Sequence, residues 1–252
     1  MKKYFIPLSF VVMALMTACS SDENNVIDEN STIQNPTSYT FQRNSQNTVD
    51  FSGQSTRLVM GGELASGLIS PEKTAGALLA MFAHEEGENN FTLASLNASN
   101  KNLRSKTAAS LDYFSTNATN QALIRADFEN WINFQVDEVF PNWNSAAAAG
   151  VSGQLEDGSS TRYVNSMGLE YDQMVIKGLI GALVVDQTLN NYLSPAVLDE
   201  GDNRANNDLA ITVEGKSYTA MEHFWDEAYG YVFGLNADPA NPNADLGADS
   251  FL

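Results

Sequence analysis

The stretch Val175-Ile-Lys-Gly-Leu-Ile-Gly-Ala-Leu-Val-Val185 decides the fold class of this chain. It forms the middle of an expected helix from Gly168 to Leu193 and is apolar on nearly every side. A helix of this kind is usually central in a bundle, because a surface helix carries its apolar residues along one side. Lys177 and Asp186 interrupt the run, which is also shorter than the about 20 apolar residues that span a membrane. The small residues Gly178, Gly181 and Ala182 would let another helix approach closely.

Helical spacing of apolar residues continues on both sides of this central helix. The clearest amphipathic segment is Thr119–Phe140, which Pro141 is expected to end. Ser55 is the expected cap of an earlier helix, and Pro71 fits the first turn of the next one. The other expected helices are Ser55–Gly67, Pro71–Phe82, Leu103–Phe114 and Tyr218–Gly234. The main apolar rows are Met60, Leu64 and Leu68 in one helix and Ile124, Phe128, Ile132 and Val136 in another.

A small β-hairpin is expected before these helices, at Tyr39–Phe51. Aromatic and polar residues alternate there around the turn-prone stretch Gln42-Arg-Asn-Ser-Gln-Asn47. Arg162-Tyr163-Val164 is a candidate short strand, and segments 87–101 and 194–217 are expected to be loops. The sequence thus predicts an all-α helical bundle with a small N-terminal β-hairpin.

The first 19 residues have the composition of a lipoprotein signal peptide. Two lysines precede an apolar run from Phe5 to Met16, which is too short to span a membrane, and small residues lead into Cys19. Cys19 is the only cysteine of the chain, so no internal disulfide competes for it. We therefore expect a lipid on Cys19. The alternative is an ordinary secretory signal with an incidental cysteine.

Residues 20–38 are expected to be a disordered acidic tether, since they are rich in Asn, Ser, Asp and Glu. Asp22 and Glu23 resemble the acidic export signal of surface-exposed lipoproteins, which would place the chain at the outer surface of an outer membrane. Residues 39–252 would then form one helical domain. The apolar pair Phe251-Leu252 follows a linker rich in Pro and Asn, so we expect that the natural chain continues beyond it.

The charge balance limits the classes of partner. The chain has 13 Lys and Arg residues against 31 Asp and Glu residues, a net charge of -18. This excess of negative charge argues against binding nucleic acid and against docking on anionic lipid. It permits cation binding, although an acidic surface is commonly only solubilising.

The densest group of ionisable side chains lies in Met221-Glu-His-Phe-Trp-Asp-Glu-Ala-Tyr-Gly230. Helical spacing puts Met221, Phe224, Trp225, Ala228 and Val232 on one face and Glu222, His223, Asp226 and Glu227 on the other. An imidazole with carboxylates one turn away is able to bind a divalent cation or transfer protons. The four polar residues are therefore candidate metal ligands. The alternative is a water-facing surface with weak ion pairs.

For two further ionisable residues, both a structural role and a functional role are open. A protonated His84 would interact favourably with the C-terminal end of its helix, and the alternative is a ligand role. Asp186 lies in the central helix, where a carboxylate must be paired or hydrogen-bonded. Tyr, Asn or Arg side chains are its expected partners, and a functional site is the alternative.

Several enzyme signatures are missing from the sequence. It contains no Gly-rich phosphate loop, no Gly-x-Ser-x-Gly elbow and no HExxH zinc motif. The chain has only two histidines, and its cysteine is assigned to the anchor. We therefore identify no catalytic residue, and no cofactor other than a divalent metal ion at the cluster around His223.

Several stretches together resemble an uncharacterised family of Bacteroidetes lipoproteins with a single domain of unknown function. They are Tyr39-Thr-Phe-Gln-Arg-Asn44, Phe51-Ser-Gly-Gln-Ser-Thr-Arg57, Leu96-Asn-Ala-Ser99, Arg162-Tyr-Val-Asn165, Lys177-Gly-Leu-Ile-Gly-Ala-Leu183 and Glu222-His-Phe-Trp-Asp-Glu-Ala-Tyr-Gly230. The resemblance extends from about Tyr39 to the end of the chain. It implies a gene encoded near those of imelysin-like proteins, which are implicated in iron uptake.

A more distant similarity is to imelysin, a helical-bundle family with the motif Gly-x-His-x-x-Glu. His223 matches the histidine of the motif, whereas Asp226 stands at the glutamate position and Met221 at the glycine position. Imelysin-like proteins are grouped with metallopeptidases. The similarity therefore implies an imelysin-like bundle, with His223 and Asp226 as site residues.

These features lead us to expect a non-enzymatic surface lipoprotein that binds a ligand or an envelope partner such as an outer-membrane receptor. The resemblance adds a role as an accessory in iron or metal acquisition. One alternative is an imelysin-like metal-dependent peptidase or hydrolase that uses His223 with Glu222, Asp226 or Glu227. Another is a structural module that binds an envelope protein without metal.

Overall fold

The computed structural model describes residues 36–244. The described residues from Thr37 onward belong to one compact unit, whose fold is given below. The signal peptide expected at residues 1–19, most of the tether and the apolar pair Phe251-Leu252 lie outside the described residues.

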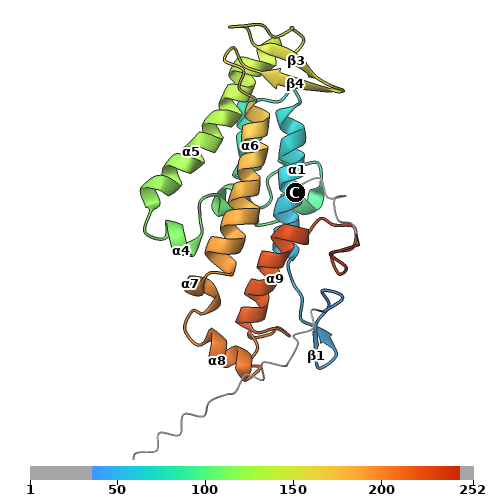
Figure 1. Ribbon diagram of the computed structural model, residues 1–252, viewed down its shortest axis with the longest axis vertical. Helices are drawn as coiled ribbons and strands as arrows, with labels where there is room; N and C mark the ends of the chain where they lie inside the picture. The colour runs from blue at the N-terminus through green and yellow to red at the C-terminus, as the bar shows by residue number, and fades with distance from the viewer. Residues whose placement is uncertain (1–35, 245–252) are drawn as a thin grey trace, which may run out of the picture. The chain divides into compact units, whose positions relative to one another are not determined.

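Long helices packed side by side make up most of the unit (Figure 1). They are α1 (Ser52–Leu68), α5 (Ala118–Phe134), α6 (Tyr171–Leu179) and α9 (Ala220–Phe233). Helix α6 continues directly into the π-helical turns η4 (Ile180–Asp186) and η5 (Thr188–Tyr192). Helix α5 continues likewise into η2 (Gln135–Val139) and the 3-10 turn η3 (Phe140–Asn142). The expected helical fold is therefore confirmed.

The helix predicted to be central has neighbours on several sides, as expected. Helix α6 packs against both α5 and α1, and its continuation η4–η5 packs against α9. Val175, Leu179 and Leu183 are fully buried. The rows predicted in α1 and α5 point into the same core, with Met60, Leu64, Leu68, Phe128 and Ile132 all buried.

The two glycines of the central helix have different roles. A Cβ on Gly178 would come within 2.7 Å of Phe128 Cζ, so the close approach expected there is confirmed. A Cβ on Gly181 would meet no atom within 4 Å, so the close approach expected at Gly181 is wrong. Among the described residues, the position faces open space.

Two β-hairpins accompany the helices. The expected N-terminal hairpin pairs β1 (Gln42–Arg43) with β2 (Gln46–Asn47). Its turn residues Asn44 and Ser45 have φ of 51° and 63°, the positive values that a two-residue hairpin turn requires. The candidate strand at 162–164 belongs to a second, unpredicted hairpin, in which β3 (Gly153–Asp157) pairs with β4 (Ser160–Val164).

Short helices occupy segments expected to be loops. They are α3 (Ala94–Asn97), α7 (Pro195–Leu198) and α8 (Asn203–Asp208). Helices α7 and α8 both pack against α9. Each is too short to carry a recognisable apolar period, so the sequence pattern did not reveal it.

The helix expected at Leu103–Phe114 is wrong. The segment forms a 3-10 turn, η1 (Arg104–Lys106), and a separate short helix, α4 (Leu111–Phe114). Ala108 between them has a φ of 51°, which a right-handed helix does not allow. Two side-chain hydrogen bonds support the break. Thr107 Oγ1 donates locally to Leu103 O, and Ser110 Oγ donates to Asp186 Oδ1 of the central helix.

Three expected helix boundaries are also corrected. Helix α1 begins at Ser52, and the Ser55 hydroxyl donates to Gly234 O of the last helix instead of capping its own. Helix α2 (Ala75–Phe82) is capped by Thr74, which accepts from Ala77 N, while Pro71 lies in the preceding turn. Pro141 lies within η3 and does not end the helix before it, because a proline fits the first turn of a tighter helix.

No helix within residues 36–244 combines the length and the apolar content needed to cross a membrane.

Candidate functional site

Helix α9 carries the predicted ionisable cluster, and its orientation differs from the expected one. Trp225, expected on the buried face, is 53 % exposed, whereas Asp226, expected on the water-facing side, is only 4 % exposed. Asp226 shares its face with Gly230, where a Cβ would clash with Phe51 Cβ beside α1. The close contact between α9 and α1 therefore turns this face inward and carries Asp226 with it.

Asp226 ties the segment before α1 to α9. The hydroxyl of Tyr39 donates to Asp226 Oδ1 over 2.8 Å, and the backbone N–H of Asp50 donates to Oδ2 over 2.9 Å. Tyr39 also stacks on Tyr229 of α9, with ring centroids 3.5 Å apart. Burial raises the pKa of Asp226 to about 6, and burial next to this carboxyl raises the pKa of the Tyr39 hydroxyl.

Glu222 ties the N-terminal hairpin to the beginning of α9. The Arg43 guanidinium donates from both terminal nitrogens to the two Glu222 oxygens, each over 2.7 Å, and also to Ser217 O. Glu222 completes a capping box with Thr219, which begins the helix. The hydrogen bonds from Arg43 hold the pKa of Glu222 below its ordinary value. This residue is therefore part of a charged clamp between hairpin and helix.

The other two candidates have different neighbours. Glu227 Oε1 accepts from Gln54 Nε2 of α1 over 2.9 Å. The His223 ring stacks on Tyr218 with centroids 4.5 Å apart, and its buried Nδ1 has no hydrogen-bond partner among the described residues. Within residues 36–244, no three His, Cys, Asp or Glu side chains are grouped so that they could hold one metal ion. Metal binding by the cluster stays a prediction.

A cleft of about 360 Å³ lies between the hairpin and α9. It is lined by Tyr39, Phe41 and Gln42 from one side and by Glu222, Trp225 and Asp226 from the other. Phe41 and Trp225 are 41 % and 53 % exposed. The clamp and the Asp226 bonds thus form a recess whose rim presents two large aromatic rings to solvent.

The two isolated candidates lie elsewhere. His84, just after α2, is buried against Phe91, and its Nδ1 lies 2.6 Å from Asn90 Oδ1. Asp186 Oδ1 accepts from Ser110 Oγ over 2.7 Å and from Asn190 Nδ2 over 3.0 Å. The expectation that a hydrogen bond partners Asp186 is confirmed, with Asn190 among the expected residue types.

The partners of the cluster were missed by the sequence analysis. They are Tyr39, Arg43, Asp50 and Gln54. Each is more than 170 positions away from its α9 partner in the chain, and no local pattern links such residues. The available signal was the alternation that predicted a hairpin at Tyr39–Phe51, which placed Tyr39, Arg43 and Asp50 in that hairpin but not near α9.

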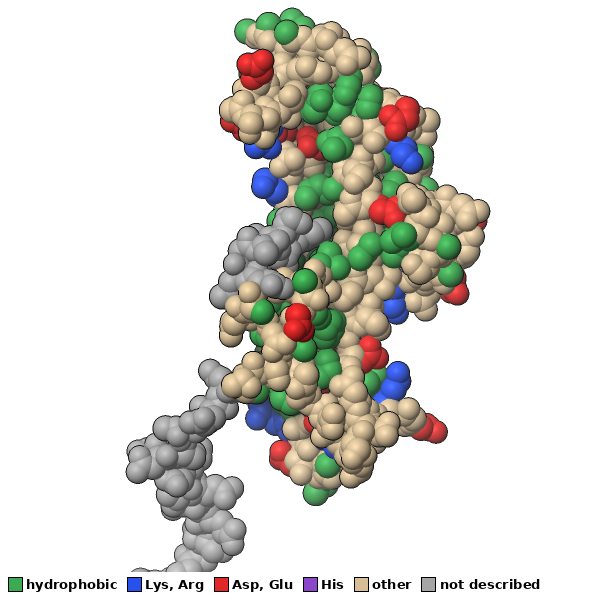
Figure 2. Space-filling view, turned by 90° about the vertical axis from the view of Figure 1, so that its right-hand side faces the viewer, with side chains coloured by type: hydrophobic (Ala, Val, Ile, Leu, Met, Phe, Trp, Pro, Cys, Tyr) green, Lys and Arg blue, Asp and Glu red, His purple; other side chains and the backbone are tan. Residues whose placement is uncertain are grey.

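Acidic residues do not gather into one large patch on the face shown in Figure 2, where acidic and basic side chains are interspersed. Hydrophobic side chains reach that surface in several small groups. The arrangement agrees with an acidic composition that serves solubility.

Comparison with known proteins identifies a family and no function. The model of a family described as a domain of unknown function, DUF4856, matches residues 36–252. No curated protein and no solved structure matches the chain. The expected resemblance to a family with a domain of unknown function is thereby confirmed.

Proposed function

The chain belongs to the DUF4856 family, and we propose that it is a lipid-anchored surface protein that binds a protein partner of the cell envelope. The proposed binding surface is the cleft between the hairpin and α9. The observation that carries the proposal is the exposure of Trp225, 53 % of which faces solvent at the rim of that cleft.

The cost of exposing aromatic rings supports a binding role. A surface-exposed Trp next to an exposed Phe leaves apolar area in water, and groups of this kind commonly mark interaction sites. Trp is also among the residues that contribute most to protein–protein affinity. The rim is held rigidly, since Arg43 fixes the hairpin to Glu222 and Tyr39 is bonded to Asp226. A rigid rim loses little entropy when a partner binds.

We prefer protein binding to catalysis or metal uptake because the carboxylates of the α9 cluster already take part in hydrogen bonds within the protein. Glu222, Asp226 and Glu227 already accept hydrogen bonds from Arg43, Tyr39 and Gln54. A metal ion or a substrate would have to share these carboxylates with the donors that already hold them. The carboxylates therefore support the cleft, and the two aromatic rings provide the contact area.

A photoactivatable residue in place of Trp225 is expected to cross-link one envelope protein in living cells. The matched control is the same residue in place of Leu123, a similarly exposed side chain on α5, which should give no such adduct. The adduct at position 225 should also weaken when Phe41→Ala is added, because Phe41 is the other exposed aromatic ring at the rim of the cleft. Equal cross-linking from both positions, or from neither, would contradict the proposed surface.

A titration with calcium, zinc and iron separates this proposal from the metal-dependent functions. At micromolar metal concentrations, we expect no metal binding that depends on the α9 cluster. Binding that His223→Ala abolishes would instead favour metal acquisition. Peptide cleavage lost in the same variant would favour an imelysin-like hydrolase.

The anchor is a separate part of the proposal and lies outside the described residues. Labelled palmitate should be incorporated into the full chain and should be absent from Cys19→Ser, because the thiol is the proposed attachment point. The variant should also leave the membrane fraction. Label that persists in Cys19→Ser would reject a lipid at this residue.

A further inference from the structure

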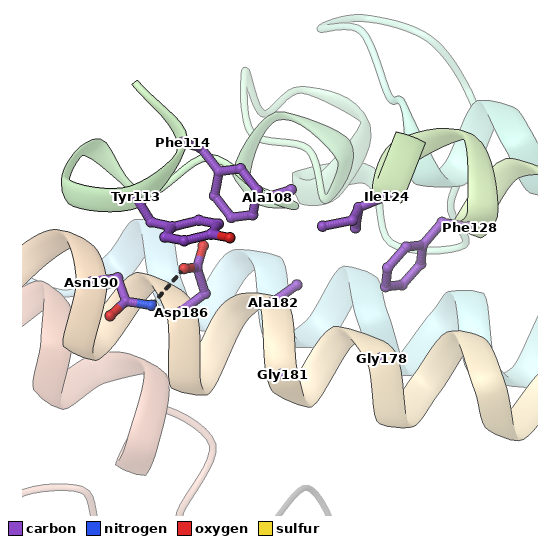
Figure 3. A pocket seen from close by; sticks show the side chains of 10 residues that line it. All are labelled: Ala108, Tyr113, Phe114, Ile124, Phe128, Gly178, Gly181, Ala182, Asp186 and Asn190. Atoms are coloured by element: carbon purple, nitrogen blue, oxygen red, sulfur yellow. Dashed lines mark hydrogen bonds between the residues drawn. The ribbon is translucent and has the colours of Figure 1, made fainter. Parts of the chain in front are cut away.

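A second cavity, of about 310 Å³, lies between α5, the segment around α4 and the middle of the central helix (Figure 3). Its walls are mainly apolar, with Phe114, Ile124, Phe128 and Ala182 among the lining residues. Asp186 and Asn190 form one end, next to Tyr113. The volume is in the range of small-molecule sites, and the combination of apolar walls and a few polar groups is typical of them.

The floor of this cavity is open because of Gly181. A Cβ at this position would meet no atom within 4 Å, although one turn earlier a Cβ on Gly178 would clash with Phe128. Because Gly181 has no side chain, this part of the cavity wall leaves room for the body of a bound molecule.

The polar end offers an acceptor that the protein leaves unused. Asp186 Oδ1 accepts from Ser110 and Asn190, whereas Oδ2 is buried and has no hydrogen-bond donor among the described residues. A buried carboxylate oxygen without a donor is costly. Among the described residues, no Lys or Arg lines the cavity. The missing donor is therefore best supplied by a cationic ligand.

Aromatic rings beside the carboxylate favour the same charge. Tyr113 and Phe114 meet edge to face, with centroids 4.8 Å apart and planes at 85°. Figure 3 shows both rings at the Asp186 end, with Tyr113 directly over the carboxylate. The faces of aromatic rings attract ammonium groups. Tyr113 is 51 % exposed, and an exposed side chain reorients rapidly enough to uncover Oδ2 when a ligand enters.

We propose that this cavity binds a small organic cation, with its ammonium group at Asp186 and its apolar body over Gly181 between Ile124 and Phe128. A bare metal ion fits less well, because Asp186 is the only carboxylate of the lining within residues 36–244 and metal sites need several ligands. The net charge of -18 also favours the approach of cations. The site is separate from the cleft at α9.

The test uses the full chain in nanodiscs of neutral phosphatidylcholine, with empty nanodiscs as background. Phenethylamine and its trimethylammonium form are titrated by calorimetry and by ligand-observed NMR. Phenylethanol and phenylpropionate, which share the ring but lack the positive charge, serve as probes of charge. We expect the two cations to bind and the neutral and anionic compounds to bind at least about tenfold more weakly.

Two variants locate the binding. Asp186→Asn keeps the shape and the acceptor for Ser110 but removes the charge, and should weaken binding of the cations about tenfold or more. Gly181→Leu should abolish binding by filling the open floor, where an added Cβ meets no atom within 4 Å. The matched control is Gly62→Leu, because a Cβ at Gly62 also meets no atom within 4 Å but lies on α1 outside the cavity. Unchanged melting temperatures would show that the variants fold.

The proposal is overturned by three results. One is the absence of cation binding at millimolar concentration. Another is equally strong binding of phenylethanol, which would remove the role of charge. The third is binding that Asp186→Asn and Gly181→Leu leave unchanged, which would place the cations elsewhere on the acidic surface.

Discussion

Gly230→Val is expected to lower the free energy of unfolding by about 3 kcal/mol, the upper end of typical overpacking costs. A Cβ at Gly230 would overlap the Cβ of Phe51, and the nearest other atoms are Phe51 Cγ and Gln54 Cβ. The overlapping Phe51 atom is attached directly to the backbone, so rotation of its side chain does not relieve the clash. Helix α9 would have to move away from α1. Urea denaturation followed by circular dichroism measures the loss.

Gly62→Val is the control for this variant. Gly62 lies on the exposed side of α1, and a Cβ there meets no atom within 4 Å. The change in stability should stay within about 0.5 kcal/mol, as at other open surface positions. If Gly230→Val were as stable as this control, α1 and α9 would not be in close contact, and the inward orientation of Asp226 would lose its explanation.

Asp226→Ala is expected to cost about 1 to 3 kcal/mol, because it leaves the Asp50 N–H and the Tyr39 hydroxyl without their acceptor. The same variant should reduce cross-linking from position 225, since Tyr39 forms the opposite wall of the cleft. Asp127→Ala, an exposed carboxylate on α5, is the control and should change neither quantity. Normal cross-linking by Asp226→Ala would show that the partner does not use the cleft.

The pH dependence of stability gives a second measurement on Asp226. Burial raises its pKa from an ordinary value of 3.8 to about 6, so the folded protein binds this proton more tightly than the unfolded chain. The resulting stabilisation is complete below about pH 4 and is lost as the pH rises through about 6. Relative to Asp226→Asn, the wild-type chain should therefore lose on the order of 1 kcal/mol between pH 4 and 7, with allowance for solvent screening. A difference that stays constant or grows with pH would contradict the raised pKa.

Local pattern determined the identity of the long helices. Val175–Val185 predicted the central helix, and the buried row Met60, Leu64 and Leu68 predicted the inner face of α1. These predictions hold because helical periodicity is a property of residues close together in the chain. Burial of the apolar row also makes the largest favourable contribution to the folding free energy of such a helix. The N-terminal hairpin was predictable for a similar reason, since Asn44 and Ser45 supply its turn.

Tertiary structure decided the faces of α9 and the breaks between short segments. Periodicity predicted the helix α9 but not which side faces the core, because Gly230 allows a close contact with Phe51 that turns Asp226 inward and leaves Trp225 outside. The bend at Ala108 likewise depends on Ser110 reaching Asp186 on another helix. Such outcomes depend on which distant surfaces meet, and a local pattern holds no information about that choice.

For the candidate sites too, the sequence identified residues and the tertiary structure identified their partners. The sequence by itself identified Glu222, His223, Asp226 and Glu227 as a cluster and Asp186 as a carboxylate in need of partners. Only the tertiary structure showed that Arg43 and Tyr39 engage the cluster, and that Gly181 faces a cavity beside Asp186. The physical reason is that hydrogen bonds and cavities form between segments far apart in the chain, whereas residue type and spacing along one helix are already present in its sequence.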